Sequence, residues 1–203
     1  MSAPRHWQGQ QSWNVRVWRL TFAALAMVLM GQRADAHMPA EGAQHTVLHP
    51  PQDGANAASW CAAHAARGEI VQAYFDCEKA VSDDPSNPRA FANRGAVFLL
   101  TNDPDKALAD FTRAMALDPH DAVLAFNRGL ALSRLGRSNE AIDDYTRATR
   151  LDPKLAIALH NRGREHELLL QRDEAVRDYR AALEISPDLE PSRQGLERLG
   201  LKK

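Results

Sequence analysis

The fold is decided by residues 122–154, which read AVLAFNRGLALSRLGRSNEAIDDYTRATRLDPK. This stretch carries an Asn-Arg-Gly triplet followed by small, aromatic and proline residues at fixed places: Asn127, Arg128, Gly129, Ala141, Tyr145, Ala148 and Pro153. The same marks stand 34 residues earlier, at Asn93, Arg94, Gly95, Ala107, Phe111, Ala114 and Pro119, and 34 residues later, at Asn161, Arg162, Gly163, Ala175, Tyr179, Ala182 and Pro187. A fixed period of this length indicates an array of repeats rather than a single closed core.

Each period contains two apolar helical stretches separated by a polar break. In the central copy the break is Leu135-Gly-Arg-Ser138, and the second stretch ends in Leu151-Asp-Pro153. Proline cannot continue the hydrogen bonds of the preceding helix, and it disfavours helical geometry in the residue before it. We therefore expect each repeat to be a helix, a turn and an antiparallel helix. The small residues would lie where the two backbones approach most closely, with the aromatic residue beside them.

These marks together resemble the tetratricopeptide repeat, which has small residues between its two helices, an aromatic residue in the second helix and a late proline. The resemblance covers Gly54 to Pro187 as four repeats: 54–87, 88–121, 122–155 and 156–189. It implies an all-α solenoid of antiparallel hairpins over residues 57–187, wound into a right-handed superhelix. The inner surface of such a superhelix is lined by the first helix of each hairpin.

Both ends of the array depart from the repeat pattern. The first repeat is degenerate, because Cys61 replaces the glycine and Cys77 replaces the aromatic residue. After the last repeat, residues 190–199 are expected to form a capping helix, as terminal repeats require. Leu196 and Leu199 would cover the last hairpin, and the charged residues that face water would be Arg193, Glu197 and Arg198.

The N-terminal segment has the pattern of a secretory signal peptide. Arg16 and Arg19 precede an apolar run over residues 20–30, and small residues follow at Ala34 and Ala36. Such a run is shorter than the roughly 20 residues that span a bilayer, so we expect cleavage after Ala36 and no stable membrane insertion of the mature chain. An uncleaved membrane anchor is the alternative. The expected destination is the periplasm or the cell exterior.

Composition argues against a nucleic-acid partner. Of 25 basic and 26 acidic residues, residues 1–36 hold four arginines and one aspartate, so the remaining chain has a net charge of −4. No basic face that would neutralise phosphates stands out. Residues 37–56 contain three prolines and show no apolar period, which is typical of a flexible lead-in. His45 and His49 lie in this proline-rich segment, so we expect no metal site there.

The two cysteines occupy positions that meet across the first hairpin. They are the only cysteines in the chain, and an exported protein with two cysteines on facing helices is expected to form a disulfide. A bond between Cys61 and Cys77 would contribute about 3 kcal/mol in the chain-entropy model. A redox pair or a metal site are the alternatives, although the spacing is not C-x-x-C and further metal ligands are missing.

Arginine and aspartate recur together sixteen residues apart in the last three repeats. The pairs are Arg94 with Asp110, Arg128 with Asp144, and Arg162 with Asp178. We expect ion pairs across each hairpin or between adjacent hairpins, with a structural role. If partly exposed, each contributes at most about 1 kcal/mol.

The resemblance places the candidate binding groove on the first helices. Its expected peptide-binding residues are Arg89, Asn93, Val123, Phe126, Asn127, Leu130, Arg134, Ile157, His160, Asn161 and Arg164. Apolar side chains exposed along a groove are costly unless a partner covers them. In similar peptide-binding proteins an asparagine at this position contacts the ligand backbone, for which its donor and acceptor are suited. Local hydrogen bonds of these asparagines within the solenoid are the alternative.

Two further resemblances fail on particular residues. The carboxylate clamp that grips acidic chaperone tails needs basic residues where Val123 and Ile157 stand, and Arg89 is the only cation at that position. The zinc-protease pattern begins at His166 but has Leu170 where the second histidine must be. His166 is therefore expected to pack or to form a local hydrogen bond, and His160 is a candidate pH-sensitive contact.

The chain has no phosphate loop and no nucleophile turn, so we expect neither catalysis nor a cofactor. The predicted function is a non-enzymatic scaffold of the bacterial cell envelope that binds a protein or peptide in the groove. The alternative is a structural module that self-assembles through the ends of its solenoid.

Overall fold

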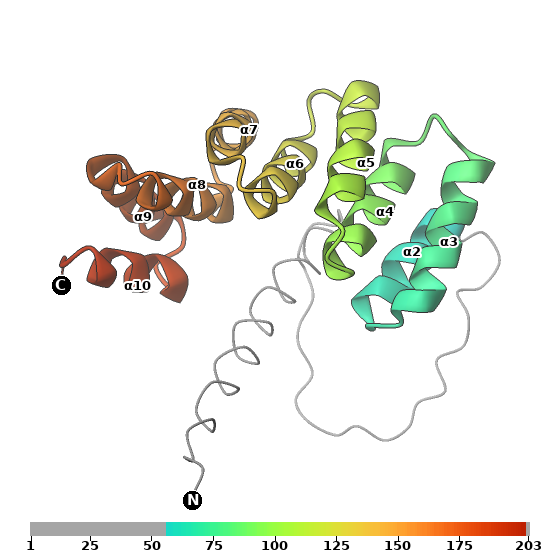
Figure 1. Ribbon diagram of the computed structural model, residues 1–203, viewed down its shortest axis with the longest axis horizontal. Coiled ribbons are helices and arrows are strands. Elements are labelled where there is room, and N and C mark those ends of the chain that lie inside the picture. The colour runs from blue at the N-terminus through green and yellow to red at the C-terminus, as the bar shows by residue number, and fades with distance from the viewer. Residues whose placement is uncertain (1–55, 202–203) are drawn as a thin grey trace, which may run out of the picture. The chain divides into compact units, whose positions relative to one another are not determined.

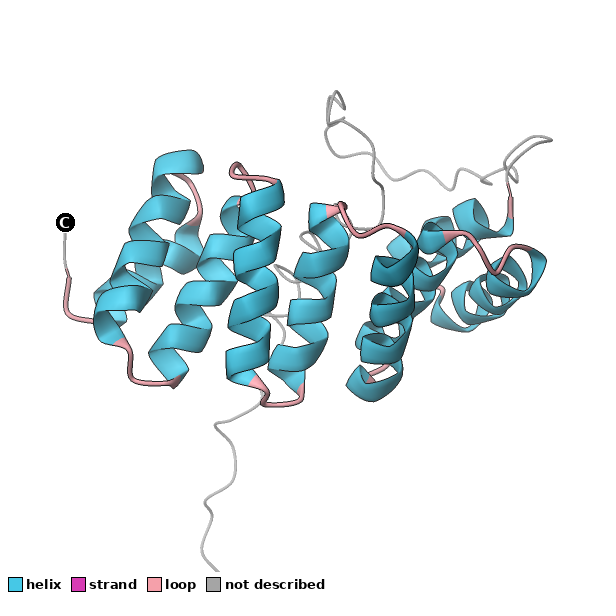
Figure 2. Ribbon diagram, turned by 90° about the horizontal axis from the view of Figure 1, so that it is seen from above, coloured by secondary structure: helices cyan, strands magenta, loops and turns pink. Residues whose placement is uncertain are grey.

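A computed structural model describes residues 56–201, which lie within one compact unit formed by residues 51–203. The described part consists of helices joined by short turns, and Figure 1 shows them following one another from α2 to α10. The helices are α2 (Ala57–Ala66), α3 (Ile70–Asp83), α4 (Pro88–Leu100), α5 (Pro104–Leu117), α6 (Ala122–Arg134), α7 (Ser138–Leu151), α8 (Ala156–Leu168), α9 (Arg172–Ile185) and α10 (Glu190–Arg198). Consecutive helices form antiparallel hairpins, as Figure 2 shows from above. The predicted all-α solenoid is confirmed.

Local sequence sets where the helices begin and end. Side-chain oxygens of Asn87, Asp103 and Asp121 accept hydrogen bonds from backbone N–H groups of the first turns of α4, α5 and α6. Proline occupies the first turn of α4, α5 and α10, where its missing N–H costs nothing. The second helices end two residues before the late proline: α7, for example, ends at Leu151, and the next residue, Asp152, has an extended backbone.

The turn inside each hairpin repeats with the same period. Gly68, Asn102, Gly136 and Leu170 all have positive φ, of 75°, 60°, 72° and 59°, and they lie 34 residues apart. Glycine adopts this conformation without strain, whereas leucine does so at a cost of about 1–2 kcal/mol. The fourth hairpin therefore keeps the turn geometry of its neighbours despite an unfavourable residue.

The core of each hairpin is a glycine facing an aromatic ring. A Cβ atom added to Gly129 would lie 2.7 Å from Cε1 of Tyr145, closer than any real contact, and Tyr145 is fully buried. Gly95 faces Phe111 and Gly163 faces Tyr179 in the same way. The predicted close approach of the two helices is thus confirmed in the last three hairpins, and each hairpin buries its own ring.

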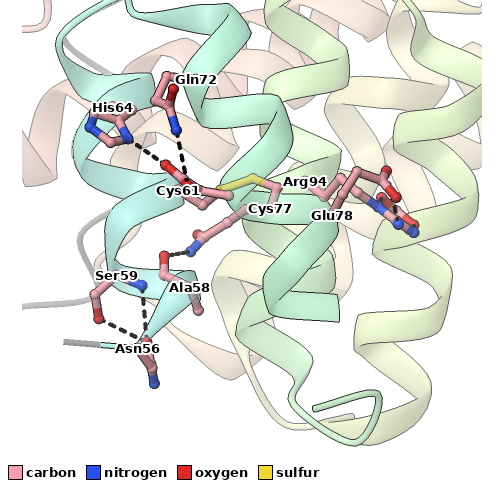
Figure 3. The surroundings of a disulfide bond; sticks show 12 residues. Asn56, Ala58, Ser59, Cys61, His64, Gln72, Cys77, Glu78 and Arg94 are labelled. Carbon is pink, nitrogen blue, oxygen red and sulfur yellow. Dashed lines mark hydrogen bonds and ion pairs between the residues drawn. A yellow bond between two sulfur atoms is a disulfide. The ribbon is translucent and has the colours of Figure 1, made fainter. Parts of the chain in front are cut away.

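The first hairpin has a disulfide in place of this ring. Cys61 on α2 and Cys77 on α3 are bonded, their Cα atoms are 4.9 Å apart, and both are completely buried. Figure 3 shows the bond between the two helices, with Arg94 and Glu78 of the next interface beside it. The predicted disulfide is therefore present, in the degenerate repeat that lacks a large aromatic residue.

The predicted arginine–aspartate pairs are also present, and each is bidentate. Nε and Nη2 of Arg128 donate to the two carboxylate oxygens of Asp144 at 2.7 and 2.6 Å, and the other two pairs have the same geometry. Hydrogen bonding to the aspartate raises the pKa of all three arginines above the ordinary value. The aspartate side chains are only 6–8% exposed, so these pairs are more buried than the sequence led us to expect.

Helix α10 covers the last hairpin through residues that the sequence did not single out. Ser192 and Gly195 are its buried residues, and a Cβ atom on Gly195 would lie 2.6 Å from Cε2 of Tyr179. Leu196 and Leu199 are half-buried. Arg198, which we expected to face water, is half-exposed but donates two hydrogen bonds of 3.0 Å to Glu167. Helix α10 thus packs like the first helix of a further repeat.

None of the described helices combines the length and the apolar character that a membrane span requires. The expected signal peptide, residues 1–36, and the lead-in up to residue 55 lie outside the described residues.

Candidate functional site

One side of the first helices is open to solvent. Because an α-helix has 3.6 residues per turn, residues seven and eleven positions apart lie on the same side of it. We call this surface the first-helix face, and it consists of Arg89, Leu100, Val123, Leu130, Arg134, Ile157, Arg164 and Leu168. The three arginines and Leu168 are exposed, and the other four side chains are half-buried. This face is the part of the predicted groove that a partner can reach.

The three predicted asparagines are buried in the free protein. Asn93 is 9% exposed and donates from Nδ2 to the carbonyl of Ala58 on the preceding first helix at 2.9 Å. Asn161 donates to the carbonyl of Ile157 one turn earlier at 3.0 Å. Asn127 is 2% exposed, and its Oδ1 has no hydrogen-bond partner among the described residues. The local alternative thus describes Asn93 and Asn161, while a role of any of the three in peptide binding stays a prediction.

Two other predicted groove residues belong to the core. Phe126 is 2% exposed and lies against Tyr145, with the ring centroids 5.9 Å apart. His160 is 6% exposed, lies 5.5 Å from the ring of Tyr179 and hydrogen-bonds through Nδ1 to Ser192 at 2.9 Å. Our expectation that Phe126 is exposed is wrong, because its position in the helix points toward the second helix of its own hairpin.

His160 is not a switch near neutral pH. Burial, together with the positive charges of Arg164 and Arg198, lowers its pKa to about 4. The imidazole is therefore neutral throughout the physiological range. The expectation of a pH-sensitive contact at His160 is corrected on this ground.

The acidic residues of the described helices lie mainly on the second helices. Helices α4, α6 and α8 contain six arginines, and their acidic residues are Glu165, which is 1% exposed, and Glu167, which is bonded to Arg198 and Tyr179. Three of those arginines bind the aspartates of the second helices, and the other three lie on the first-helix face. Arg134 donates to the carbonyl of Leu99 at 2.5 Å, and none of these three forms an ion pair within the described part of the chain. The first-helix face is therefore positively charged.

A buried carboxylate between α6 and α8 was not expected from the sequence. Ser133 donates to Oε1 of Glu165 at 2.5 Å, and Oε2 of Glu165 finds no partner in the described residues. The equivalent positions in the preceding repeats are Val97 and Ala131, so a period-based comparison would have marked Glu165 as unusual. Together with the bond from Arg134 to α4, this contact ties neighbouring first helices to one another.

His166 forms a local hydrogen bond, as expected. Its Nδ1 lies 2.6 Å from Oε1 of Gln171, and its Nε2 is 3.7 Å from the carboxylate of Asp178. Within residues 56–201 no group of three or more histidine, cysteine, aspartate or glutamate side chains is placed to hold a metal ion. His45 and His49 lie outside the described residues.

Helical hairpins of this kind, stacked in register and carrying an open charged face, define the class of α-solenoid interaction modules. Family models for the tetratricopeptide repeat match residues 88–121, 122–155 and 156–189, which is half of the chain. The chain belongs to the tetratricopeptide repeat family. No curated protein matches the chain.

Solved structures share the fold. The crystal structure of MamA is similar with a TM-score of 0.64 and 21% identity, over 68% of this chain and 81% of MamA. PilF of Pseudomonas aeruginosa gives a TM-score of 0.66 and 23% identity, over 70% of this chain and 65% of PilF. The second tetratricopeptide domain of human RPAP3, in complex with the HSP70 peptide SGPTIEEVD, gives a TM-score of 0.53 and 28% identity, over 57% of this chain and all of that domain. Repeat proteins of this family are interaction modules, and some of them bind peptides.

Proposed function

We propose that this protein is a non-enzymatic scaffold that binds an acidic peptide segment of a partner protein along the first-helix face. The observation that carries the proposal is the set of three arginines on the first-helix face that form no ion pair within the described residues. Arg89, Arg134 and Arg164 are exposed and have no carboxylate partner among the described residues, and α4 and α6 contain no acidic residue. Complementary charge accelerates encounter and selects the partner more than it adds affinity.

The half-buried aliphatic side chains between the arginines would supply the apolar part of the contact. Val123, Leu130 and Ile157 lie beside the arginines on α6 and α8, and Leu168 is 65% exposed. A related domain of RPAP3 that binds the peptide SGPTIEEVD supports an acidic ligand. The residues that would carry binding differ from the clamp pattern, because Val123 and Ile157 replace its cations.

Charge reversal on this face is expected to abolish binding. A variant with Arg134→Glu and Arg164→Glu should bind an acidic peptide at least about tenfold more weakly, since two attractive contacts become repulsive. The matched control is Arg180→Glu, an exposed arginine of α9 for which the structure gives no ion pair. Fluorescence anisotropy would be measured with peptides of equal length in which acidic residues are replaced by their amides, at low and high salt. Equal binding of the acidic and amide peptides would contradict the proposal.

The proposed location is the cell envelope, after export by the segment that ends at Ala36. The supporting pattern is the arginine-flanked apolar run over residues 20–30. N-terminal sequencing of the exported protein should find His37 as the first residue. A mature chain that still contains Trp18 would contradict cleavage.

Self-assembly through the solenoid ends has weaker support. Helix α10 already covers the last hairpin, through Gly195 against Tyr179 and Arg198 against Glu167. No contact in the described structure favours end-to-end stacking over peptide binding.

A further inference from the structure

A pocket of about 270 Å³ opens where α5, α6 and α7 meet. Leu108 of α5 and Leu132 of α6 give it apolar walls, and Thr112 and Arg128 give it polar groups. Charged residues of α7 surround them. We call this cavity the α5–α7 pocket. Its volume is slightly below the range of about 300–1,000 Å³ typical of small-molecule sites, so it has room for a single side chain.

The pocket lies on the opposite side of α6 from the first-helix face. Successive residues of an α-helix are rotated by about 100°. Arg128 and Leu132 are thus turned by roughly 150° from the direction of Val123, Leu130 and Arg134. An occupant of the α5–α7 pocket would therefore leave the first-helix face free, and the two sites can be tested separately.

The repeats themselves show what fills this position elsewhere. One repeat earlier, the equivalent residues are Tyr74 and Phe98, whose rings meet edge to face at 6.1 Å. The guanidinium of Arg94 lies 5.9 Å from the centre of the Phe98 ring. One repeat later, the position of Leu132 is taken by His166, which Gln171 holds by a hydrogen bond. In the central interface two leucines leave open a space that an aromatic or imidazole ring occupies in its neighbours.

The central arginine also retains an unused donor. Nη1 of Arg94 donates to Glu78 at 3.2 Å, and Nη1 of Arg162 donates to Thr146 at 3.1 Å. In the central interface the residue equivalent to Glu78 and Thr146 is Thr112. Arg128 forms no hydrogen bond with Thr112 and has no described partner besides Asp144. Its side chain is 27% exposed, against 18% for Arg94 and 20% for Arg162. The central arginine thus turns a free N–H toward the open space.

We propose that the α5–α7 pocket is a second binding site, which takes one aromatic side chain of a partner protein together with a neutral carbonyl oxygen beside it. The ring would lie between Leu108 and Leu132 and against the guanidinium of Arg128, as Phe98 lies against Arg94. The carbonyl oxygen would accept from Nη1 of Arg128, as Glu78 accepts from Arg94.

Charge selects a neutral acceptor over a carboxylate. The pocket contains two positive residues, Arg128 and Arg137, against three negative ones, Glu140, Asp143 and Asp144. A carboxylate would add to this negative excess, whereas a backbone or side-chain amide would not. The expected ligand is therefore a phenylalanine or tyrosine inside a peptide chain, and a C-terminal aromatic residue would bind less well. This preference is opposite to that of the first-helix face.

The test uses the full chain and a minimal probe, N-acetyl-phenylalaninamide. NMR titration should shift the signals of Leu108, Thr112, Leu132 and the Nε–H of Arg128, with a dissociation constant on the order of 1 mM. N-acetyl-alaninamide, which has no ring, and N-acetyl-phenylalanine, which ends in a carboxylate, should each bind at least about tenfold more weakly. Unmoved signals at a probe concentration on the order of tens of millimolar would overturn the proposal.

The neighbouring interface supplies the blocking variant. Leu132→Phe with Thr112→Glu gives the central interface the phenylalanine and glutamate that the preceding interface has at Phe98 and Glu78. This double variant should bind the probe at least about tenfold more weakly. Thr112→Glu alone serves if the double variant does not fold, because Thr112 is exposed and the new carboxylate would occupy Arg128. Arg134→Ala, on the first-helix face, should leave probe binding unchanged. Undiminished binding to the Thr112→Glu variant, or a loss caused by Arg134→Ala, would place the probe elsewhere and overturn the proposal.

Discussion

Replacing Arg128 with methionine is expected to lower the free energy of unfolding by about 3 kcal/mol. The arginine holds Asp144 with two hydrogen bonds, and the Asp144 side chain is 6% exposed. Without its partner, the carboxylate would be left buried and uncompensated, which typically costs about 3–5 kcal/mol. We expect the lower end of that range because the Arg128 side chain is 27% exposed. Chemical denaturation followed by circular dichroism measures the loss.

Two controls separate the ion pair from its surroundings. Arg180→Met removes an exposed arginine of α9 and should change stability by less than about 0.5 kcal/mol. Arg128→Met combined with Asp144→Leu removes both charges and should recover most of the loss, since a buried ion pair replaced by apolar side chains is often neutral. A loss below about 1 kcal/mol for Arg128→Met would mean that solvent compensates Asp144, as at exposed salt bridges.

Removing the disulfide is expected to loosen the first hairpin selectively. Cys61→Ala with Cys77→Ala frees a loop closed over 16 residues, which costs about 3 kcal/mol in the chain-entropy model. Each repeat contacts only its neighbours, so the effect should fade along the array. Hydrogen exchange should accelerate in α2 and α3 and remain nearly unchanged in α7, α8 and α9.

The other repeats suggest a rescue for this variant. Cys61→Gly with Cys77→Phe gives the first hairpin the glycine and aromatic ring that Gly95 and Phe111 provide in the second. If the disulfide substitutes for ring packing, this variant should regain protection that the double alanine variant lacks. Equal loss of protection across all helices would contradict a local role of the bond.

The sequence predicted those features that depend on spacing alone. Prolines after the second helices, glycine opposite an aromatic ring, and arginine sixteen residues before aspartate all follow from a constant period. Continuing the period once more would also have found Ser192 and Gly195, which stand where the preceding repeat has Ala158 and Asn161. These features can be predicted because residues at the same position in successive repeats have the same surroundings.

The candidate site was harder to predict because it depends on which side of a helix a residue faces and on how large its neighbours are. Phe126 and Val123 are both apolar residues of α6, but Phe126 points to Tyr145 whereas Val123 is half-exposed. The α5–α7 pocket exists because Leu108, Thr112 and Leu132 are together too small to fill the space. No single position shows this, and only comparison of three interfaces in three dimensions brings it out.

Helix α10 covers the C-terminal end of the array. Its contacts with Tyr179 and Glu167 use up the surface on which another hairpin would stack at the C-terminal side. A further copy of the chain would have to displace α10 before it could stack on the last hairpin. If the first-helix face binds a peptide as proposed, the length of the bound segment would be set by α4, α6 and α8.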